Sequence, residues 1–584
     1  MTDATNLRRR PLEWWERRKL ETNGCRSTDW SSVRICDATD LDSVRNVDFV
    51  GAVSLGIVRE QLGSVIEDAR IENSVIGDYA TIRNIGVALR NCVVGRNACI
   101  ENTGLIEFEA ESMCGVGSEI DVLDETGSRV VPLIPGLSAQ TALLIAREPK
   151  WAELHFRPMV EEYLEHFVAP HTIGEGAIVR GCGSLRNVSV GHEVKVIGAR
   201  NLANGMIINN AAPGRCLAFV GSGVDAENFI VEDGVVDSGA LVRNSYIGQG
   251  ASLEKGFSAH DSLFFANCSL ENGEACALFA GPYTVSMHKA SLLIGCQTSF
   301  MNAGSGTNQS NHMYKLGPVH WGILERGVKT SSASYLMLGA KIGAFSLLMG
   351  QHKTHPDSSQ FPFSYLFGDD RGATVVVPGV MLKSCGLLRD EKKWPARDRR
   401  LKRKLPLHDR IIFDVLNPCT VDRMLSASDV IETLLSHPAD DDRFVRYRGM
   451  KFSRASLDRA RHLYELGIYK YLHLHLEDGV FPTPSDQWAA PAEWVDIAGL
   501  PMTRTALREA MKASTLQELK GAFDAAFENY RDTEREWIAL RFPERWHRPA
   551  EVIADYAGEF DRMVDEDRTR YLEELAAQND MLAL

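Results

Sequence analysis

Residues 76–110 read IGDYATIRNIGVALRNCVVGRNACIENTGLIEFEA, and this stretch decides the fold. Apolar residues recur in it every six positions, and a small residue or Cys follows four positions after each of them. The apolar positions are Ile76, Ile82, Ala88, Val94, Ile100 and Ile106, and the small ones are Ala80, Gly86, Cys92, Ala98, Gly104 and Ala110. A period of six fits neither an α-helix nor the simple alternation of an ordinary strand. It predicts a three-sided coil of short parallel strands, in which each turn buries its inner face only by stacking on the next.

The six-residue pattern resembles that of the hexapeptide-repeat, left-handed parallel β-helix proteins. The fold expected for the chain is therefore mainly β: a left-handed parallel β-helix with a helical insertion and an α-helical C-terminal domain. The pattern is regular over 71–110, weaker over 171–255 and interrupted up to about residue 350, so we expect protruding loops there. Because Gly86 occupies a small position, Gly86→Leu is expected to overpack the wall of the coil.

Breaks in the pattern divide the chain into units. Pro132, Pro135 and Gly136 end the first set of repeats, which resume at Ile173. Basic residues are dense beyond Arg389, and apolar residues recur at three- and four-residue spacing, typical of helices, after residue 418. The expected units are a lead-in or cap at 1–50, β-helix at 51–136, a helical insertion at 137–170, β-helix with protruding loops at 171–388, a basic linker at 389–417 and an α-helical domain at 418–584.

The composition is typical of a globular protein without a nucleic-acid partner. The 584 residues are 44% hydrophobic and carry a formal net charge of −14, so no general basic field is present. The longest apolar runs are far shorter than the ~18–20 residues that span a bilayer, and residues 1–19 lack the apolar core of a signal peptide. The twelve Cys are scattered without a Cys-x-x-Cys motif, which favours reduced thiols in a cytoplasmic protein.

The resemblance to hexapeptide proteins implies several functions. Many members are acyltransferases that use acyl-CoA or acyl carrier protein, and others are nucleotide-sugar enzymes, γ-class carbonic anhydrases or structural proteins. Cys25, Asp29-Trp30, the helical insertion and the motif Trp394-Pro-Ala-Arg-Asp-Arg-Arg400 are also similar to a family of large bacterial β-helix proteins of unknown function, and this closer resemblance covers nearly the whole chain. The sequence has no leading αβ domain with a Gly-rich phosphate-binding segment and Lys, so a fused sugar-phosphate nucleotidyltransferase domain is not expected.

Candidate catalytic residues lie in 257–357, which holds six of the sixteen His and a polar segment at 304–315. The acyltransferase resemblance implies that one His acts as the general base on an acceptor hydroxyl or amine, while backbone amides stabilise the oxyanion. His312 is the first candidate, with Asn311 as its orienting neighbour, and His288 is the second. The expected substrate-binding residues are Asn308, Gln309, Lys315 and His260. A structural ladder of Asn and Gln along the turns, with His in packing roles, is the alternative interpretation.

A metal site is the other interpretation of the His residues. A γ-carbonic-anhydrase-like site places three His around zinc and water. That family has two His five positions apart, and the sequence offers no such pair near His312. His352 and His355 are three positions apart, so no metal ligand is assigned.

The basic run at 392–404 is suited to the phosphates of CoA or a nucleotide. Arg397, Arg399 and Arg400 supply guanidinium groups that bind phosphate in a bidentate manner. A solvated face of a linker is the alternative interpretation of this run.

These features predict a cytoplasmic transferase of the hexapeptide type that transfers an acyl group to a sugar or sugar-nucleotide through a His general base. Its cofactor is unknown, and acyl-CoA is the candidate donor substrate. The expected assembly is a homotrimer, without nucleic acid and without a membrane span. The alternatives are a non-enzymatic β-helix scaffold or a module that binds sugar phosphates or nucleotide-sugars, followed by a γ-carbonic-anhydrase-like metal site.

Overall fold

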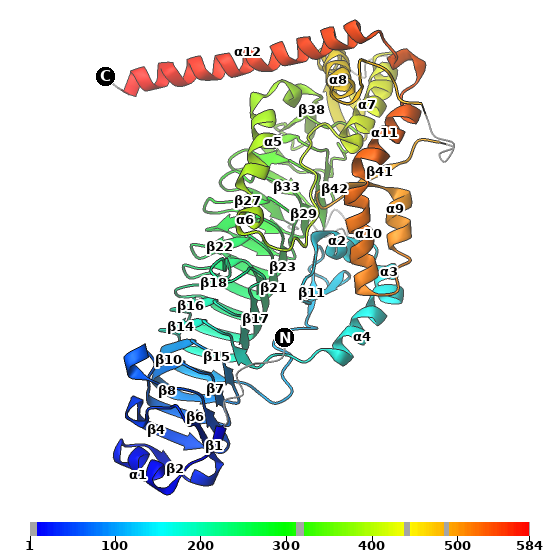
Figure 1. Ribbon diagram of the computed structural model, residues 1–584. Helices are drawn as coiled ribbons and strands as arrows, with labels where there is room; N and C mark the ends of the chain where they lie inside the picture. Colours follow the sequence, from blue (N-terminus) through cyan, green and yellow to red (C-terminus); the bar gives the residue numbers. More distant parts are fainter. Residues whose placement is uncertain (1–8, 311–320, 437–443, 484–489, 583–584) are drawn as a thin grey trace.

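A coil of stacked parallel strands forms the body of the molecule (Figure 1). The computed structural model describes residues 9–310, 321–436, 444–483 and 490–582. The first part of the coil contains β2 (Arg26–Ser27), β3 (Val33–Cys36), β4 (Val44–Val50), β5 (Val53–Leu55), β6 (Ile66–Glu72), β7 (Val75–Ile76), β8 (Thr81–Arg90), β9 (Val93–Val94) and β10 (Cys99–Glu107). At the N-terminal end, β1 (Arg9–Pro11) pairs antiparallel with β3, and α1 (Trp14–Thr22) follows it. The stack therefore begins within 1–50, where a lead-in was expected.

The second part of the coil continues the same stack to about residue 368. Its first strands are β13 (Thr172–Ile173), β14 (Ile178–Arg180), β15 (Ser184–Val190), β16 (Lys195–Ile197), β17 (Asn201–Ile208), β18 (Phe219–Val220), β19 (Asp225–Glu232), β20 (Val235–Val236), β21 (Leu241–Ile247), β22 (Ser252–Glu254), β23 (Ser258–Phe264) and β24 (Ser269–Glu271). The later ones are β25 (Glu274–Cys276), β26 (Phe279–Ala280), β27 (Val285–Ser286), β28 (Leu292–Ile294), β29 (Cys296–Thr298), β30 (Asn308–Ser310), β31 (Gly322–Leu324), β32 (Lys329–Thr330), β33 (Tyr335–Met337), β34 (Lys341–Ile342), β35 (Leu347–Met349), β36 (Gln351–His352) and β37 (Tyr365–Gly368). The expectation of a parallel β-helix is confirmed.

Asn residues form one corner of successive turns of the coil. Asn187 lies inside β15 with φ of 56°, and the strand pairs with β17 on both sides of it. Asn is among the few residues other than Gly that adopt this left-handed conformation readily. Its Nδ2 donates a hydrogen bond of 3.2 Å to Oδ1 of Asn204, the corner residue of the next turn, 17 positions later. The same bond joins Asn84 to Asn102, Asn228 to Asn244 and Asn244 to Asp261, so a ladder of polar side chains follows this edge.

The interior of the coil is apolar at the positions that the sequence pattern predicts. Ile76, Ile82, Ala88, Val94, Ile100 and Ile106 are each at most 1% exposed. The register nevertheless shifts by one residue inside β8 and β10, so that Ile106 aligns with Leu89 and not with Ala88. Because Leu89 also aligns with Ile71 of β6, the column of large apolar residues runs through Leu89.

The helical insertion leaves the coil between two consecutive turns. Strand β10 pairs directly with β14 and β15, as Cys99 with Ile178 and Leu105 with Ser184, so residues 108–171 are absent from the stack. The coil thus pauses at Glu107, earlier than the expected residue 136. The insertion contains a hairpin of β11 (Glu119–Asp121) and β12 (Val130–Pro132), then α2 (Ala139–Arg147), α3 (Pro149–Trp151), a π-helical turn (Ala152–Phe156) and α4 (Arg157–His166).

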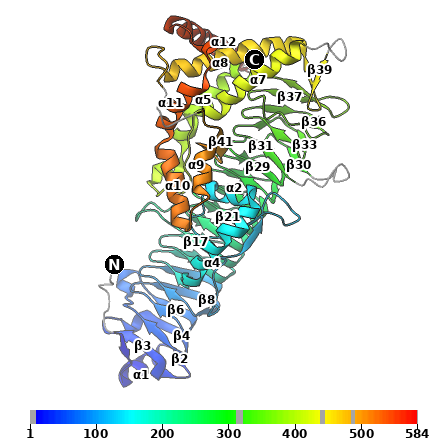
Figure 2. The same ribbon diagram turned by 90° about the vertical axis from the view of Figure 1, so that its right-hand side faces the viewer.

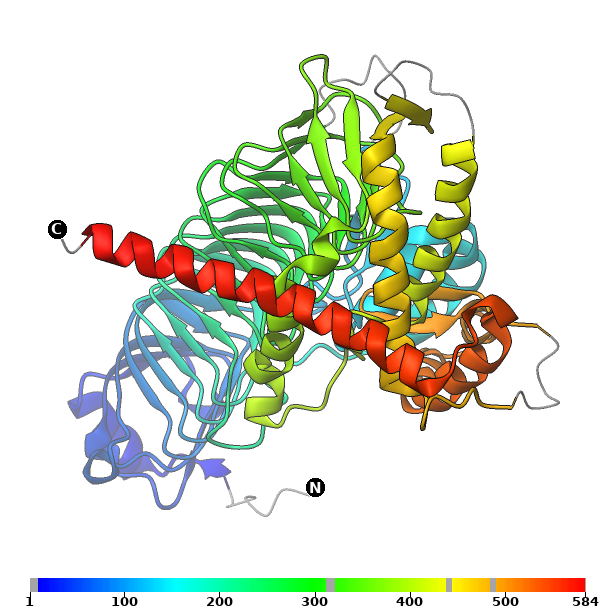
Figure 3. The same ribbon diagram turned by 90° about the horizontal axis from the view of Figure 1, so that it is seen from above.

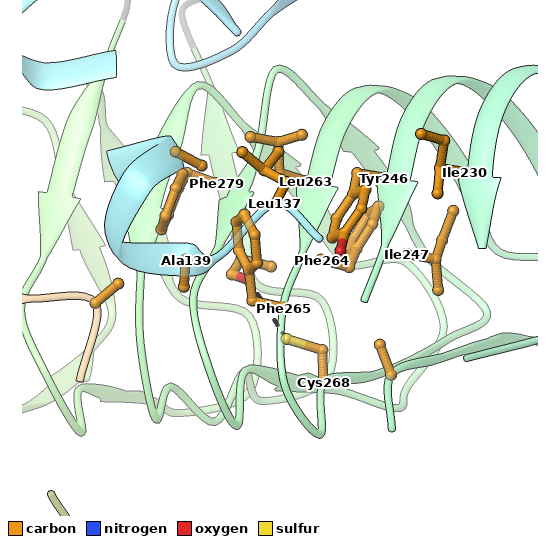
Figure 4. Close-up of a cluster of buried hydrophobic side chains, with 14 of the residues drawn as sticks. Leu137, Ala139, Ile230, Tyr246, Ile247, Leu263, Phe264, Phe265, Cys268 and Phe279 are labelled. Atoms are coloured by element: carbon orange, nitrogen blue, oxygen red, sulfur yellow. Dashed lines mark hydrogen bonds between the residues drawn. The ribbon is translucent and has the colours of Figure 1, made fainter. Parts of the chain in front are cut away.

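The insertion folds back onto an apolar column on the outside of the coil. The strand register aligns Ile230, Tyr246, Leu263 and Phe279 on successive turns, and all four are buried. Figure 4 shows Leu137 and Ala139 of the insertion beside Leu263, Phe265 and Phe279. Since full burial of one large apolar side chain contributes about 1.5–3 kcal/mol, this contact holds the insertion firmly in place.

A buried polar cluster joins the insertion, the coil and the segment after residue 403. Glu232 accepts hydrogen bonds from the Tyr246 hydroxyl at 2.8 Å, from Nε2 of His408 at 2.9 Å and from the backbone N–H of Gly136 at 2.7 Å. Burial opposes ionisation of Glu232, yet its hydrogen bond with His408 and the charge of that ring hold the pKa of the carboxyl below its ordinary value. The cluster therefore connects three distant segments of the chain through one carboxylate.

Helices cover two sides of the second part of the coil. The C-terminal elements are β38 (Thr374–Val377), α5 (Cys385–Arg397), α6 (Arg399–Arg403), α7 (Pro418–Ser436), β39 (Phe444–Tyr447), β40 (Met450–Ser453), α8 (Arg454–His475), β41 (Trp494–Ile497), β42 (Leu500–Thr503), α9 (Arg504–Ala510), α10 (Leu516–Glu528), α11 (Tyr530–Arg541) and α12 (Ala550–Leu582). Figure 2 shows α2, α9 and α10 against one side of the coil, and Figure 1 shows α5 and α6 along another. Helix α12 packs on α8 and then extends past the rest of the molecule (Figure 3).

Two properties of the described residues bear on the environment of the protein. None of the helices in the described ranges is long and apolar enough to cross a membrane. All twelve cysteines are described, and none of them forms a disulfide. Seven of these twelve thiols are buried as small apolar side chains.

Candidate functional site

A groove with a volume of about 620 Å³ lies between the coil and helices α5 and α6. Its floor is a column of outward side chains from four consecutive turns, aligned by the strand register: Ser269, Val285, Asn302 and Lys329. Since neighbouring strands are about 4.8 Å apart, the column is roughly 14 Å long. We call this site the basic groove.

Helix α5 forms the wall of the basic groove with one of its faces. Asp390, Lys393, Trp394 and Arg397 all line it, and their spacing of three and four places them on one side of the helix. Helix α6 adds Arg399 and Lys402, which are three positions apart. The complete lining is Asn267, Ser269, Tyr283, Val285, Met287, His288, Phe300, Met301, Asn302, Ala303, Lys329, Asp390, Lys393, Trp394, Arg397, Arg399 and Lys402.

A buried ion pair fixes the turn between the two helices. Arg400 is 2% exposed, and its guanidinium donates to Asp398 at 2.8 Å and to the carbonyl of Asp409 at 3.0 Å. Asn267 of the coil donates to Asp398 and accepts from the N–H of Arg399, which ties this turn to the groove floor. Burial opposes ionisation of Asp398, but the Arg400 guanidinium more than offsets it and lowers the pKa of the carboxyl. Arg400 was predicted to bind phosphate, but its guanidinium is buried and pairs with Asp398 of the protein itself.

Polar contacts close the basic groove at both ends. At one end Nζ of Lys329 lies 2.6 Å from Oδ2 of Asp390, so the coil and α5 are joined by an ion pair. At the other end Arg399 donates to the carbonyl of Gly250 at 2.7 Å and to Oγ of Ser269 at 3.2 Å. The space between these contacts is therefore bounded along its length.

Aromatic rings form an apolar side of the groove. Tyr283 and Phe300 stack with centroids 5.3 Å apart, and Trp394 meets Phe300 edge-on at 4.7 Å. The Tyr283 hydroxyl donates to the carbonyl of Trp394 at 3.1 Å, which holds the helix over these rings. Burial, with the nearby Asp398 carboxylate, raises the pKa of Tyr283, so the hydroxyl stays protonated and remains a donor.

The middle of the groove holds three cations that have no side-chain partner in the described part of the chain. Lys393, Arg397 and Lys402 form no hydrogen bond or ion pair through their side chains within the described ranges. Among the described residues that line the groove, Asp390 is the one acidic side chain, and Lys329 already pairs with it. The surplus positive charge is localised, since the chain as a whole carries −14. Such a surplus attracts anions, and the paired N–H groups of Arg suit phosphate oxygens.

The predicted catalytic and substrate-binding residues divide into three groups. His288 is exposed and lines the basic groove. His260 is exposed on β23 outside the groove, with Nδ1 2.8 Å from Asp261. Asn308 and Gln309 lie on β30, in a different strand stack of the coil, and both amide atoms of the buried Gln309 lack a hydrogen bond among the described residues. His312, Asn311 and Lys315 lie outside the described residues.

The structure therefore brings together three of the predicted residues, His288, Arg397 and Arg399. It adds Lys329, which sequence reasoning did not assign to a site. Lys393, Trp394 and Lys402, which belong to the basic run at 392–404, also line the groove. The spacing from Asp390 to Arg397 is a readable signal for one helix face, but nothing in the sequence pairs that face with Lys329. Among the described residues, no group of three His, Cys, Asp or Glu side chains could hold a metal ion.

The fold and the groove define a class of protein: a parallel β-helix with a basic groove under a helical strap. Residues 9–435 match the family model described as Domain of unknown function (DUF4954), so the chain belongs to that family. The match includes the whole groove and ends at the last residues of α7. No curated protein matches the sequence.

Proposed function

We propose that the protein is a transferase of the hexapeptide type, which holds a phosphate-bearing donor such as acyl-CoA in the basic groove and transfers the acyl group to a sugar or sugar-nucleotide. The observation that carries the proposal is a set of cations, Lys393, Arg397 and Lys402, whose side chains have no partner among the described residues, beside the exposed His288. Phosphates supply the negative charge that this lining lacks.

His288 is the proposed general base. Its ring takes the proton of the acceptor hydroxyl while the hydroxyl oxygen attacks the carbonyl carbon of the thioester. The new C–O bond forms, the C–S bond breaks, and the proton passes to the departing thiolate. Backbone N–H groups of the coil are the proposed stabilisers of the oxyanion.

Steady-state kinetics test this role. With acetyl-CoA as donor and a panel of sugars and nucleotide-sugars as acceptors, release of free thiol reports turnover. His288→Ala is expected to lower kcat by about 10²–10⁴ with little change in the donor KM. His260→Ala removes an exposed histidine outside the groove and serves as the matched control. Full turnover in His288→Ala would contradict the assignment of the base.

The cations of the basic groove are expected to contribute to binding of the donor more than to the chemical step. Lys393→Gln should raise the donor KM more than it lowers kcat, because phosphates far from the reacting carbon interact alike in the ground and transition states. Lys392→Gln makes the same charge change one position away, on a residue outside the groove lining. Equal KM values for the two variants would contradict a donor site in the basic groove.

A second candidate function is a binding module without turnover. It is favoured by one observation: within the described part of the chain, no hydrogen bond orients the His288 ring. For this function, calorimetry would show that Lys393→Gln weakens phosphate binding, while His288→Ala leaves it unchanged and no thiol is released.

A further inference from the structure

We propose that the basic groove recognises a nucleoside diphosphate, with the base stacked on Trp394 and the two phosphates bound by Lys393, Arg397 and Lys402. This inference rests on the proposed function, because it names the part of the donor that the same groove holds. A nucleoside diphosphate is common to CoA and to nucleotide-sugars, so the recognised chemistry is shared by both.

The size of the groove fits a nucleotide better than an isolated phosphate. Its volume of about 620 Å³ lies within the range of sites for small organic ligands, ~300–1,000 Å³. The floor extends over four turns, from Ser269 to Lys329, roughly 14 Å. A single phosphate would leave most of this length, and all of its apolar side, unfilled.

The arrangement of charge and ring along α5 follows from the helix period. Lys393 and Arg397 are four positions apart, and Trp394 is three positions before Arg397, so their Cβ atoms are neighbours at about 5–6 Å. Lys402 adds a cation from α6. A ligand that carries a flat ring and two adjacent negative charges therefore meets both features at once.

The Trp394 ring is held ready for stacking. Phe300 packs edge-on against it, Tyr283 holds its backbone carbonyl, and the residue is half-buried, which leaves part of the indole open to the groove. A ring that is fixed before binding loses little conformational freedom when a base stacks on it. Stacking on an aromatic side chain tolerates any base, because every base has a π-face.

The contacts at the two ends of the groove favour a mononucleotide over a continuous nucleic-acid strand. Lys329 with Asp390 bridges one end, and Arg399 with Ser269 bridges the other. A polymer would need an open path along the coil, whereas a mononucleotide fits between the bridges. The negative charge of the chain outside the groove also repels a long phosphate backbone.

Isothermal titration of the full-length chain with five ligands tests the inference: ADP, UDP, CoA, inorganic pyrophosphate and ribose 5-phosphate. ADP or UDP is expected to bind at least about tenfold more tightly than pyrophosphate or ribose 5-phosphate, because only the nucleotides supply a base. Trp394→Leu should remove this advantage while pyrophosphate affinity stays unchanged, and that unchanged affinity shows that the variant is folded. The ADP, UDP and CoA arms identify which nucleotide carrier is preferred.

Charge variants complete the test. Lys402→Gln should weaken every phosphate ligand about three- to tenfold, and Arg403→Gln, on the same short helix but outside the groove lining, should not. If pyrophosphate and ADP bind equally and Trp394→Leu changes neither, the phosphate site of the proposed function stands and the nucleotide inference is overturned. If none of the five ligands binds, both are overturned. Tighter binding of a single-stranded oligonucleotide than of ADP also overturns the inference.

Discussion

His352 is a buried histidine whose environment makes stability depend on pH. Its side chain is fully buried, Nδ1 is 2.9 Å from Oγ1 of Thr374, and Nε2 lacks a partner among the described residues. Burial lowers the pKa of this ring from its ordinary value of 6.5 to about 4. Between these two values the unfolded chain binds a proton that the folded chain does not, so the contribution to stability is complete above pH 6.5 and is lost as pH falls toward 4.

We expect His352→Leu to remove this dependence, because Leu336 occupies the neighbouring position of the same column and shows that leucine fits there. Relative to the variant, the wild-type chain should lose about 2 kcal/mol of unfolding free energy between pH 7.5 and pH 5. Denaturant titrations at the two pH values measure it, with His473→Leu as the control at an exposed histidine. Parallel losses in wild type and His352→Leu would show that the ring does not stay neutral in the folded protein.

Single residues also show why the site was only partly predictable. The basic run at 392–404 predicted a phosphate-binding segment, and Arg397 and Arg399 of this run do line the groove. Arg400 has the same chemistry but pairs with Asp398 inside the protein, because Asp398 caps α6 and turns Arg400 inward. Arg399 and Arg400, which are adjacent in the sequence, thus differ in burial because of the position at which α6 begins and the place of Asn267 on the coil. Lys329 joins the groove through contacts with a residue 61 positions away, which no local pattern encodes.

At the scale of elements, the repeat predicted the coil but not its irregularities. The apolar period places Ile76, Ile82 and Ile100 in the interior, because three sixes make one turn and the side chains must stack. One extra residue in β8 then shifts the frame, and Leu89 takes the place expected for Ala88. After such a bulge the apolar pattern continues one residue later along the strand. A search for apolar residues at an exact spacing of six therefore does not detect the shift.

The small positions of the repeat differ in how tightly they are packed. A Cβ on Gly104 would lie 2.3 Å from the carbonyl oxygen of Gly183, whereas a Cβ on the exposed Gly86 would lie 3.4 Å from its nearest atom, Cα of Gly104. We therefore expect Gly104→Ala to lower the unfolding free energy by about 1–3 kcal/mol. Gly86→Ala, the matched control, should be neutral or slightly stabilising, because alanine restricts the unfolded chain. Thermal unfolding of both variants measures the difference.

The sequence predicted that a larger side chain at Gly86 would overpack the wall of the coil. In the structure the tightly packed position is Gly104. Gly86 faces the outside of the coil, where a larger side chain meets solvent, while Gly104 faces backbone of the next turn. Equal stability of the two alanine variants would contradict the close approach of the turns at Gly104.

At the scale of the whole molecule, the two parts of the coil differ in how much of their outer surface is packed against helices. Helices lie along two sides of the second part, whereas the first part has helix α1 at its N-terminal end (Figures 1 and 2). Val75 and Val93 align on successive turns and are 38% and 47% exposed. An exposed apolar column of this kind is a surface that association can bury.

The expected homotrimer stays a prediction, and the first part of the coil is the surface proposed for it. Light scattering is expected to give three times the chain mass of 64.7 kDa, and Val93→Asp should shift the mass toward one copy, because a charge is costly to bury in an apolar contact. Asp is placed at an exposed position, so the fold of the subunit should be retained. A mass of one chain for the wild type would reject the trimer.

The contact between the insertion and the C-terminal elements has a consequence for synthesis on the ribosome. Nε2 of Gln140 donates to the carbonyls of Arg410, Ile497 and Ala498, which follow it by 270, 357 and 358 positions. At translation rates of about 5–20 residues per second, these partners emerge roughly 14 to 70 seconds after Gln140. The first turns of the coil can stack as they leave the exit tunnel, but the side of helix α2 that packs on β41 and α10 must wait for these elements. A chaperone can therefore bind this side of the helix for much of the time in which the rest of the chain is synthesised.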